Sequence, residues 1–234
     1  MSAPGAASPP AGFWPRYAAW SLDAVLIAAL TCLLGAGHWR RLIEQGSRAH
    51  ADLNARLAEA MASSASDDLA FGGFLGRLGE QPQVHAAATA ATSAWIGLVL
   101  GWLLVYAALG LLYEVGFVAF TPWRATPGKR ALGLYVAARD GGELGPVRAA
   151  LRYLGGSLSW LTLNLGHLLA AGKPEHLALH DRLAGASVRR RGAARMPAWG
   201  WAWLVLQVAA TLAACVWLMW TLQASLDAAL NGAL

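Results

Sequence analysis

Arg16 and Asp23 are the first charged residues of the chain, and both lie at the start of a long apolar run. As an α-helix with a rise of 1.5 Å per residue, residues 17–36 are long enough to cross the ~30 Å hydrocarbon core of a bilayer. A carboxylate inside such a run costs roughly 2.5–3.5 kcal/mol on insertion scales, so it normally faces protein or water and has a partner. Arg16 precedes Asp23 by about 10 Å of helix, which is too far for a simple ion pair. We therefore expect each of the two to find its partner elsewhere in the chain.

Asp23 has two interpretations. In a low-dielectric pocket its carboxylate could bind a proton and a cation in competition, which is the smallest possible antiport site. Alternatively, it belongs to a buried charge network that locks a later polar motif to the first helix. The sequence favours the lock and leaves transport as the alternative. The predicted network consists of Arg16, Asp23, Asp181 and Arg182.

Two other polar motifs do not complete a catalytic or metal site. His176 and His180 are four residues apart, but no third ligand follows at a telling spacing, so capping and hydrogen bonding are favoured. Gly128-Lys129 lacks the upstream Gly and the following Ser or Thr of a phosphate-binding loop. No nucleophile and base stand together in the sequence. We therefore expect no enzyme, no metal and no cofactor.

The composition predicts a polytopic membrane protein. Hydrophobic residues make up 57% of the chain and charged residues only 13%, where a soluble domain averages about 25% charged. The 18 basic residues exceed the 13 acidic ones, but the excess lies beside apolar runs. It is therefore interpreted as a topology signal and not as a nucleic-acid site. The two cysteines form no disulfide framework.

Three apolar helices are predicted to span the membrane, over residues 17–36, 95–120 and 199–222, each with tryptophans near its ends. In the second helix, Gly97 and Gly101 have the GxxxG spacing that lets another helix approach closely. Glu114, the one charge of that helix, is either a headgroup-level carboxylate or a neighbour of Asp23.

The segments between these helices predict the topology. Residues 1–12 are expected to be a disordered tail, and residues 38–93 a polar insertion with one short amphipathic helix. Residues 71–75 are expected to touch the membrane surface. Residues 121–198 are strongly basic, so the positive-inside rule places them and the N-terminus in the cytoplasm, and residues 38–93 outside.

Residues 147–171 are apolar enough to be considered as a further span. Spanning would export the basic residues that follow, so we predict a re-entrant or interfacial helical hairpin, bent around residues 162–166. The alternating run 132–136, followed by an Asp-Gly turn, is expected to pair with a strand at residues 186–188. The predicted fold is mainly α and integral to the membrane, with three transmembrane helices, this hairpin and a small cytoplasmic β-hairpin-like element.

Three ordered motifs carry a family resemblance. An Arg opens the first helix and an Asp lies inside it, at Arg16 and Asp23. A Thr-Pro-Gly-Lys-Arg-Ala-Leu-Gly-Leu stretch follows at residues 126–134, and His-Asp-Arg-Leu-Ala-Gly closes the pattern at residues 180–185. In this order the motifs resemble those of the RDD family of small bacterial membrane proteins, named for one Arg and two Asp. Asp181 is then the second Asp.

The resemblance covers residues 13–189 apart from the 38–93 insertion. Residues 190–198 are left as a basic linker, and residues 199–234 as an additional C-terminal transmembrane helix and tail. Ala186 stands where family members usually have Thr. The resemblance implies a membrane location and a transport role, with cation/proton antiport proposed for some members, but no settled mechanism.

We therefore expect a multi-pass protein of the bacterial inner (plasma) membrane, with a cytoplasmic N-terminus. Its network locks the membrane core to the cytoplasmic motif and serves assembly with partners; the alternative is a small-solute or cation/proton transporter that uses Asp23. The expected partners are membrane lipids and a second copy, through Gly97 and Gly101, or another membrane protein, without nucleic acid. The residues assigned to lipid-headgroup or partner contacts are Gly128, Lys129, Arg130, Gly133, His180 and Gly185.

Overall fold

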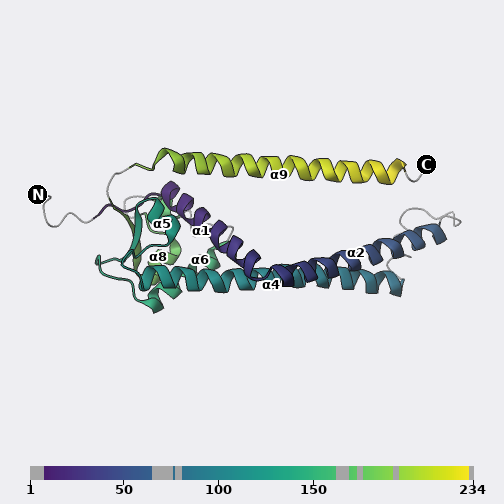
Figure 1. The fold of residues 1–234 in the computed structure, drawn as a ribbon, viewed down its shortest axis with the longest axis horizontal. Helices are drawn as coiled ribbons and strands as arrows, with labels where there is room; N and C mark the ends of the chain where they lie inside the picture. Colours follow the sequence, from purple (N-terminus) through teal and green to yellow (C-terminus); the bar gives the residue numbers. More distant parts are fainter. Residues whose placement is uncertain are drawn as a thin grey trace, which may run out of the picture. The chain divides into compact units, whose positions relative to one another are not determined.

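The computed structural model describes residues 8–64, 76, 81–161, 169–172, 176–191 and 195–231, and it is mainly helical (Figure 1). Two short strands lie among the helices. In chain order the elements are α1 (Phe13–Leu34), α2 (Ala36–Ser64), α4 (Pro82–Ala119), α5 (Pro127–Ala131), β1 (Leu134–Ala138), α6 (Pro146–Leu161), the 3-10 helix η1 (Leu169–Ala171), α8 (Leu179–Ala184), β2 (Ala186–Arg190) and α9 (Ala198–Asn231).

In the described part of the chain, three helices are long and apolar enough to cross a membrane. They are α1, α4 and the 198–224 portion of α9, with mean hydropathies of 1.8, 2.2 and 2.0. The three predicted apolar helices are thereby confirmed, but two of them are longer than expected. α4 begins at Pro82 and not at residue 95, and α9 continues to Asn231. With 38 residues, α4 is ~57 Å long, well beyond the ~30 Å of a hydrocarbon core.

The connection after α1 is more helical than predicted. A short amphipathic helix was expected there, whereas α2 has 29 residues. Within α2, Asp52 and Arg56 form an ion pair four residues apart, with Nε and Oδ1 3.5 Å apart, and Arg56 also pairs with Glu59. Because such exposed pairs contribute little, the helix depends on propensity and packing. The predicted surface segment at residues 71–75 lies outside the described residues.

The chain divides into two compact units, residues 26–110 and residues 1–25 with 111–234. In the first of these, Gly101 faces Trp39, whose ring would lie 3.9 Å from an added Cβ. Gly97 is exposed, and no described atom lies within 4 Å of a Cβ built there. The two glycines therefore do not form one packing site in this unit, and their role in an oligomer stays a prediction.

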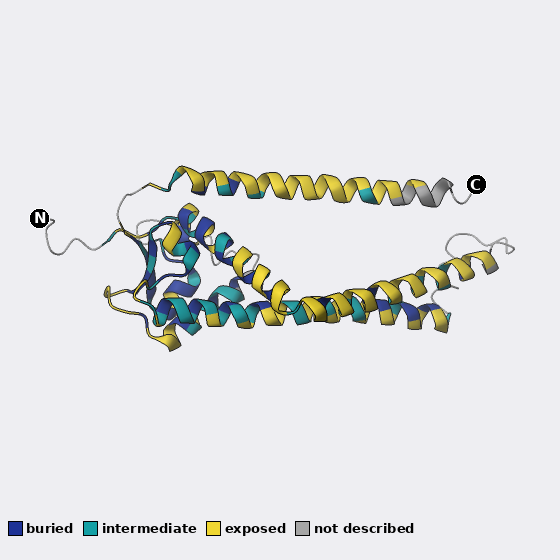
Figure 2. Ribbon diagram, viewed as in Figure 1, coloured by how far each residue is buried: buried dark blue, intermediate teal, exposed yellow. Residues whose placement is uncertain are grey.

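The second unit, residues 1–25 with 111–234, contains the sheet. β1 and β2 are antiparallel, with Val136 opposite Val188, which confirms the predicted strand pair. β1 begins at Leu134 and not at residue 132, because Leu132 caps α5 and Gly133 makes the turn between them with a φ of +67°. Figure 2 shows the buried residues gathered around this sheet, while most of α9 is exposed.

Part of the predicted N-terminal tail belongs to this sheet. Pro10 forms a bridge with Arg189, and Ala11 N donates to the Val188 carbonyl at 2.9 Å. Ala11 is fully buried in the core beside β1 and β2. The prediction of disorder over residues 1–12 is therefore wrong for residues 9–11, because backbone pairing holds a segment that side-chain composition alone could not order.

α6 is an amphipathic helix that packs against α8, and it is not one of the candidate spans. Gly155 allows the close approach, since a Cβ there would lie 3.3 Å from His180 Cβ. The bend predicted at residues 162–166 lies outside the described residues. The re-entrant or interfacial hairpin therefore stays a prediction, of which α6 is the first arm.

Candidate functional site

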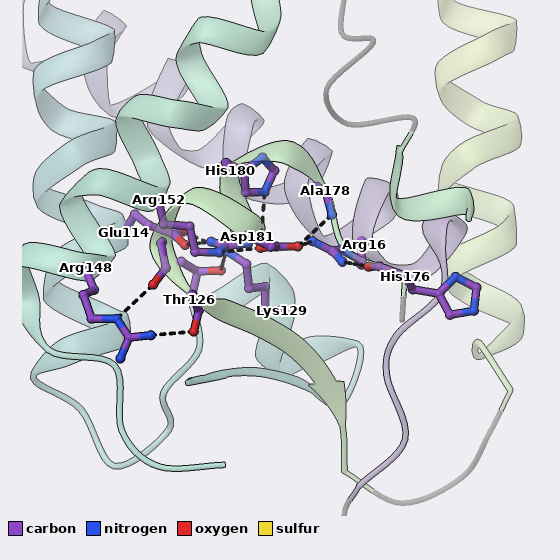
Figure 3. A network of polar contacts seen from close by, with 12 residues as sticks. Arg16, Glu114, Thr126, Lys129, Arg148, Arg152, His176, Ala178, His180 and Asp181 are labelled. Atoms are coloured by element: carbon purple, nitrogen blue, oxygen red, sulfur yellow. Dashed lines mark hydrogen bonds and ion pairs between the residues drawn. The ribbon is translucent and has the colours of Figure 1, made fainter. Parts of the chain in front are cut away.

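Asp181 is the centre of a buried polar network in the second unit (Figure 3). It lies in the first turn of α8, where its Oδ2 accepts from the Ala178 backbone N–H at 3.2 Å, as acidic residues do at helix starts. Its carboxylate also forms ion pairs with Arg16 of α1 and, at 2.9 Å, with Arg152 Nε of α6. Arg16 donates in addition to the His176 carbonyl at 2.5 Å. Asp181 thus joins three separate helices.

Glu114 is the second acidic residue of the network. It lies near the end of α4 and forms ion pairs with Arg152 and, at 2.7 Å, with Lys129 Nζ of α5. Arg152 therefore bridges Glu114 and Asp181. From Arg16 to Lys129 the charges alternate in sign along one continuous chain of contacts.

Asp23 is held differently from the other two carboxylates. Its Oδ1 accepts from Tyr113 Oη and from the Gly128 backbone N–H, both at 2.7 Å, and its Oδ2 accepts from Thr126 Oγ1 at 2.5 Å. All three donors are uncharged, and Asp23 is 5% exposed. Lys129 Nζ, 3.3 Å from Thr126 Oγ1, links this group to the rest of the network. Asp23 and Arg16 thus have separate partners, as their spacing along the helix requires.

The charges of the network balance. The network contains three basic residues, Arg16, Lys129 and Arg152. It also contains three acidic residues, Asp23, Glu114 and Asp181. Burial alone would raise the pKa of Asp181, but the positive charges of Arg16 and Arg152 outweigh it and hold that pKa well below its usual range. Burial would lower the pKa of Arg152, but Asp181 and Glu114 outweigh it and raise that pKa. The network is therefore charged, compensated and largely shielded from water.

The glycines of the two motifs have structural roles. A Cβ at Gly128 would overlap the Ala19 carbonyl and lie 2.8 Å from Asp23 Oδ1, so only glycine lets α5 dock on α1. Gly185 ends α8 in the left-handed region with a φ of +59°. Arg148 donates to the Ala184 and Gly185 carbonyls at 2.9 and 2.5 Å and satisfies the end of α8. The motifs thus fit the elements against one another.

The membership of the network differs from the prediction. Arg182 lies exposed, and in the described part of the chain its side chain joins neither Asp23 nor Asp181, so its assignment to the network is wrong. The orientation of α8 turns Asp181 inward and the next residue outward. Arg152 is buried and takes the bridging place. Lys129 is inside the network through Glu114 and not free for a headgroup.

Other residues were missed or lie at the edge. Tyr113 was not singled out, since hydroxyl donors are common in apolar helices. Thr126 opens the motif at residues 126–134, but no role was assigned to its hydroxyl. For Glu114 the sequence left two interpretations open, a headgroup-level carboxylate or a neighbour of Asp23. As the single acidic residue of an apolar helix, it did require a partner. His180 is buried, with Nε2 3.5 Å from Asp181 Oδ1. Among the described residues, no three His, Cys, Asp or Glu side chains gather as metal ligands.

A protein-family model matches most of the chain. The model of the RDD family matches residues 10–185 of the 234-residue chain. The chain belongs to the RDD family. No curated protein and no solved structure matches it significantly. The matched range holds every member of the network, while β2 and α9 lie beyond it. The three residues that carry the resemblance, Arg16, Asp23 and Asp181, all belong to the network.

Proposed function

We propose that this RDD-family protein is a non-enzymatic integral protein of the inner membrane. Its network fixes the sheet-containing module to the apolar helices, and the fixed module is a platform on which partner proteins assemble. The observation that carries this proposal is the set of internal contacts: α1, α4, α5, α6 and α8 are held together by one chain of buried polar groups.

The saturation of the carboxylates supports the lock. Asp23 has three donors, Glu114 has two cationic partners, and Asp181 has two cations and a backbone N–H. A carboxylate that binds and releases an ion must give up some of these contacts in each cycle. Two of the donors are backbone N–H groups of α5 and of the residue before α8, so their release would also displace those elements. A buried network whose carboxylates are all satisfied is suited to specifying one arrangement.

One observation favours transport as a second candidate. Asp23 lies in a candidate span and accepts only from uncharged donors, whereas Asp181 and Glu114 contact cations directly. A proton or a cation would therefore neutralise Asp23 without displacing an arginine. The alternative function is a small-solute or cation/proton transporter with Asp23 as its protonatable site.

Proton flux driven by a cation gradient in proteoliposomes distinguishes the two functions. We expect no flux above that of empty liposomes with the wild type. We expect Asp23→Asn to lower the stability by about 1–2 kcal/mol, because hydrogen bonds to a charged acceptor are weakened. The second measurement is the thermal melt of each variant in detergent. Wild-type flux that disappears in Asp23→Asn, with the melt unchanged, would contradict the lock and establish transport.

The proposed orientation predicts which residues are reached from outside. In a protein whose Cys32 and Cys215 are replaced by Ala, we expect Asp52→Cys to react with a membrane-impermeant maleimide on intact spheroplasts. Glu143→Cys should react only after permeabilisation, because it follows β1 on the basic, cytoplasmic side. Both native side chains are more than half exposed, so access is decided by the membrane. The opposite labelling pattern would reverse the orientation, and the cysteine-free protein is the background control.

A further inference from the structure

Two arginines and a tryptophan form a cluster just after α4. Trp123 stacks on Phe117 of α4, with ring centroids 6.0 Å apart and 14° between the planes. The guanidinium carbon of Arg130 lies 3.6 Å from the centroid of the Trp123 ring. Arg191 Nη2 donates to the Trp123 carbonyl at 3.0 Å. Trp123, Arg130 and Arg191 are called the arginine–tryptophan cluster below.

The two arginines of the cluster have no carboxylate partner among the described residues, unlike the cations beside them. Arg124 pairs with Glu143 at 2.5 Å, and Lys129 pairs with Glu114 at 2.7 Å. The Arg191 guanidinium lies 5.0 Å from the ring centroid of Tyr135. Both cluster arginines are exposed. A cation–π contact attracts the charge of the guanidinium and does not require its N–H donors, which stay available for an acceptor.

The cluster lies at a belt of exposed aromatic residues. Trp14 of α1 and Trp201 of α9 have ring centroids 6.1 Å apart, so the starts of these helices are at one level. Phe120, immediately after α4, is 72% exposed. Figure 1 shows the starts of α1 and α9 and the end of α4 together beside the sheet. Exposed tryptophans at the ends of apolar helices are typical of a membrane–water interface, which is the level of lipid headgroups.

We propose that the arginine–tryptophan cluster binds the phosphate group of an anionic phospholipid. The planar donor fork of arginine matches a phosphate in two-pronged geometry, and two arginines held by one tryptophan concentrate positive charge at that level. Lys129, which was also expected at headgroup level, is paired with Glu114. Arg191, which directly follows β2, is the second arginine of the cluster in its place. The inference is independent of whether the network locks the fold or supports transport, since neither cluster arginine belongs to the network.

Native mass spectrometry of the full-length protein in detergent tests this site. The probe is an equimolar mixture of phosphatidylglycerol and phosphatidylcholine. We expect the wild type to retain phosphatidylglycerol preferentially. The double variant Arg130→Gln/Arg191→Gln should lose that preference by roughly fivefold for each arginine removed. Its melting temperature in lipid-free detergent should stay close to that of the wild type.

A variant of equal charge is the matched control. Arg139 and Arg182 are also exposed, but neither contacts Trp123 among the described residues, so Arg139→Gln/Arg182→Gln should retain the preference. An equal loss of the lipid preference in this control would mean diffuse electrostatic attraction and not binding at the cluster, and it would also overturn the proposal. Retention of the preference for phosphatidylglycerol by Arg130→Gln/Arg191→Gln would overturn the proposal. If Arg130→Gln/Arg191→Gln does not fold, Arg130→Lys/Arg191→Lys is tested instead. A wild-type preference for phosphatidylglycerol in the folded lysine variant would also overturn the proposal.

Discussion

Asp181→Asn is expected to lower the free energy of unfolding by about 3–5 kcal/mol, because it leaves two buried guanidinium groups without their shared counter-charge. Arg16 and Arg152 both pair with this carboxylate, whose side chain is completely buried. The amide keeps the size of the side chain and can still accept a hydrogen bond, so the effect reports the charge. The measurement is unfolding in mixed micelles with increasing sodium dodecyl sulfate, followed by far-ultraviolet circular dichroism.

The adjacent Arg182 offers a control for this prediction. Its side chain is exposed, so Arg182→Gln should change the stability by no more than about 0.5 kcal/mol. Equal losses in the two variants would mean that α8 as a whole, and not the Asp181 charge, is the sensitive element. Wild-type stability in Asp181→Asn would show that the network contributes nothing to holding the helices together.

The pH dependence of the stability of wild type and Asp181→Asn is a second measure of the effect of the Asp181 charge. The pKa of Asp181 is lower in the folded protein than in the unfolded chain, so the unfolded state binds the proton first as the pH falls. The stabilisation is therefore complete above the ordinary carboxyl pKa of about 3.9 and is lost progressively below it. The difference in stability between wild type and Asp181→Asn should be constant near neutral pH and should shrink in strong acid.

Gly128→Ala is expected to lower the free energy of unfolding by about 3 kcal/mol, near the upper end of the range for overpacking. The added methyl group would overlap the Ala19 carbonyl, a backbone atom that cannot rotate away, and would crowd the Asp23 carboxylate. α5 would have to move off α1, and the hydrogen bond from the Gly128 N–H to Asp23 would lengthen. The unfolding assay described for Asp181→Asn measures the loss.

Gly116→Ala is the matched control for Gly128→Ala. Gly116 lies inside α4, and no described atom comes within 4 Å of a Cβ built there. Alanine at this position should leave the stability unchanged or raise it by roughly 0.5–1 kcal/mol, because glycine is the poorer helix residue. A loss in Gly116→Ala as large as that in Gly128→Ala would remove the steric explanation.

Much of the fold follows from local patterns in the sequence. Uninterrupted apolar runs predict three long helices because only a helix satisfies its own backbone in an apolar setting. Alternation before the Asp140-Gly141 turn predicts β1, and it pairs with the predicted strand at β2. These signals depend on neighbouring residues, so they are legible without the tertiary structure. The limits of α2 and α4 were missed because polar helices carry weak periodic signals and frequent alanine extends helices beyond an apolar core.

The need of Arg16 and Asp23 for partners follows from the sequence, since a charge in an apolar run is too costly to leave alone. The identity of those partners depends on the tertiary structure. Arg16 meets Asp181, 165 residues away, while Asp23 meets hydroxyl and backbone donors. The choice of Arg152 over Arg182 depends on how α6 and α8 are rotated against α1. That rotation is set by packing across the whole unit, and no short stretch of sequence encodes it.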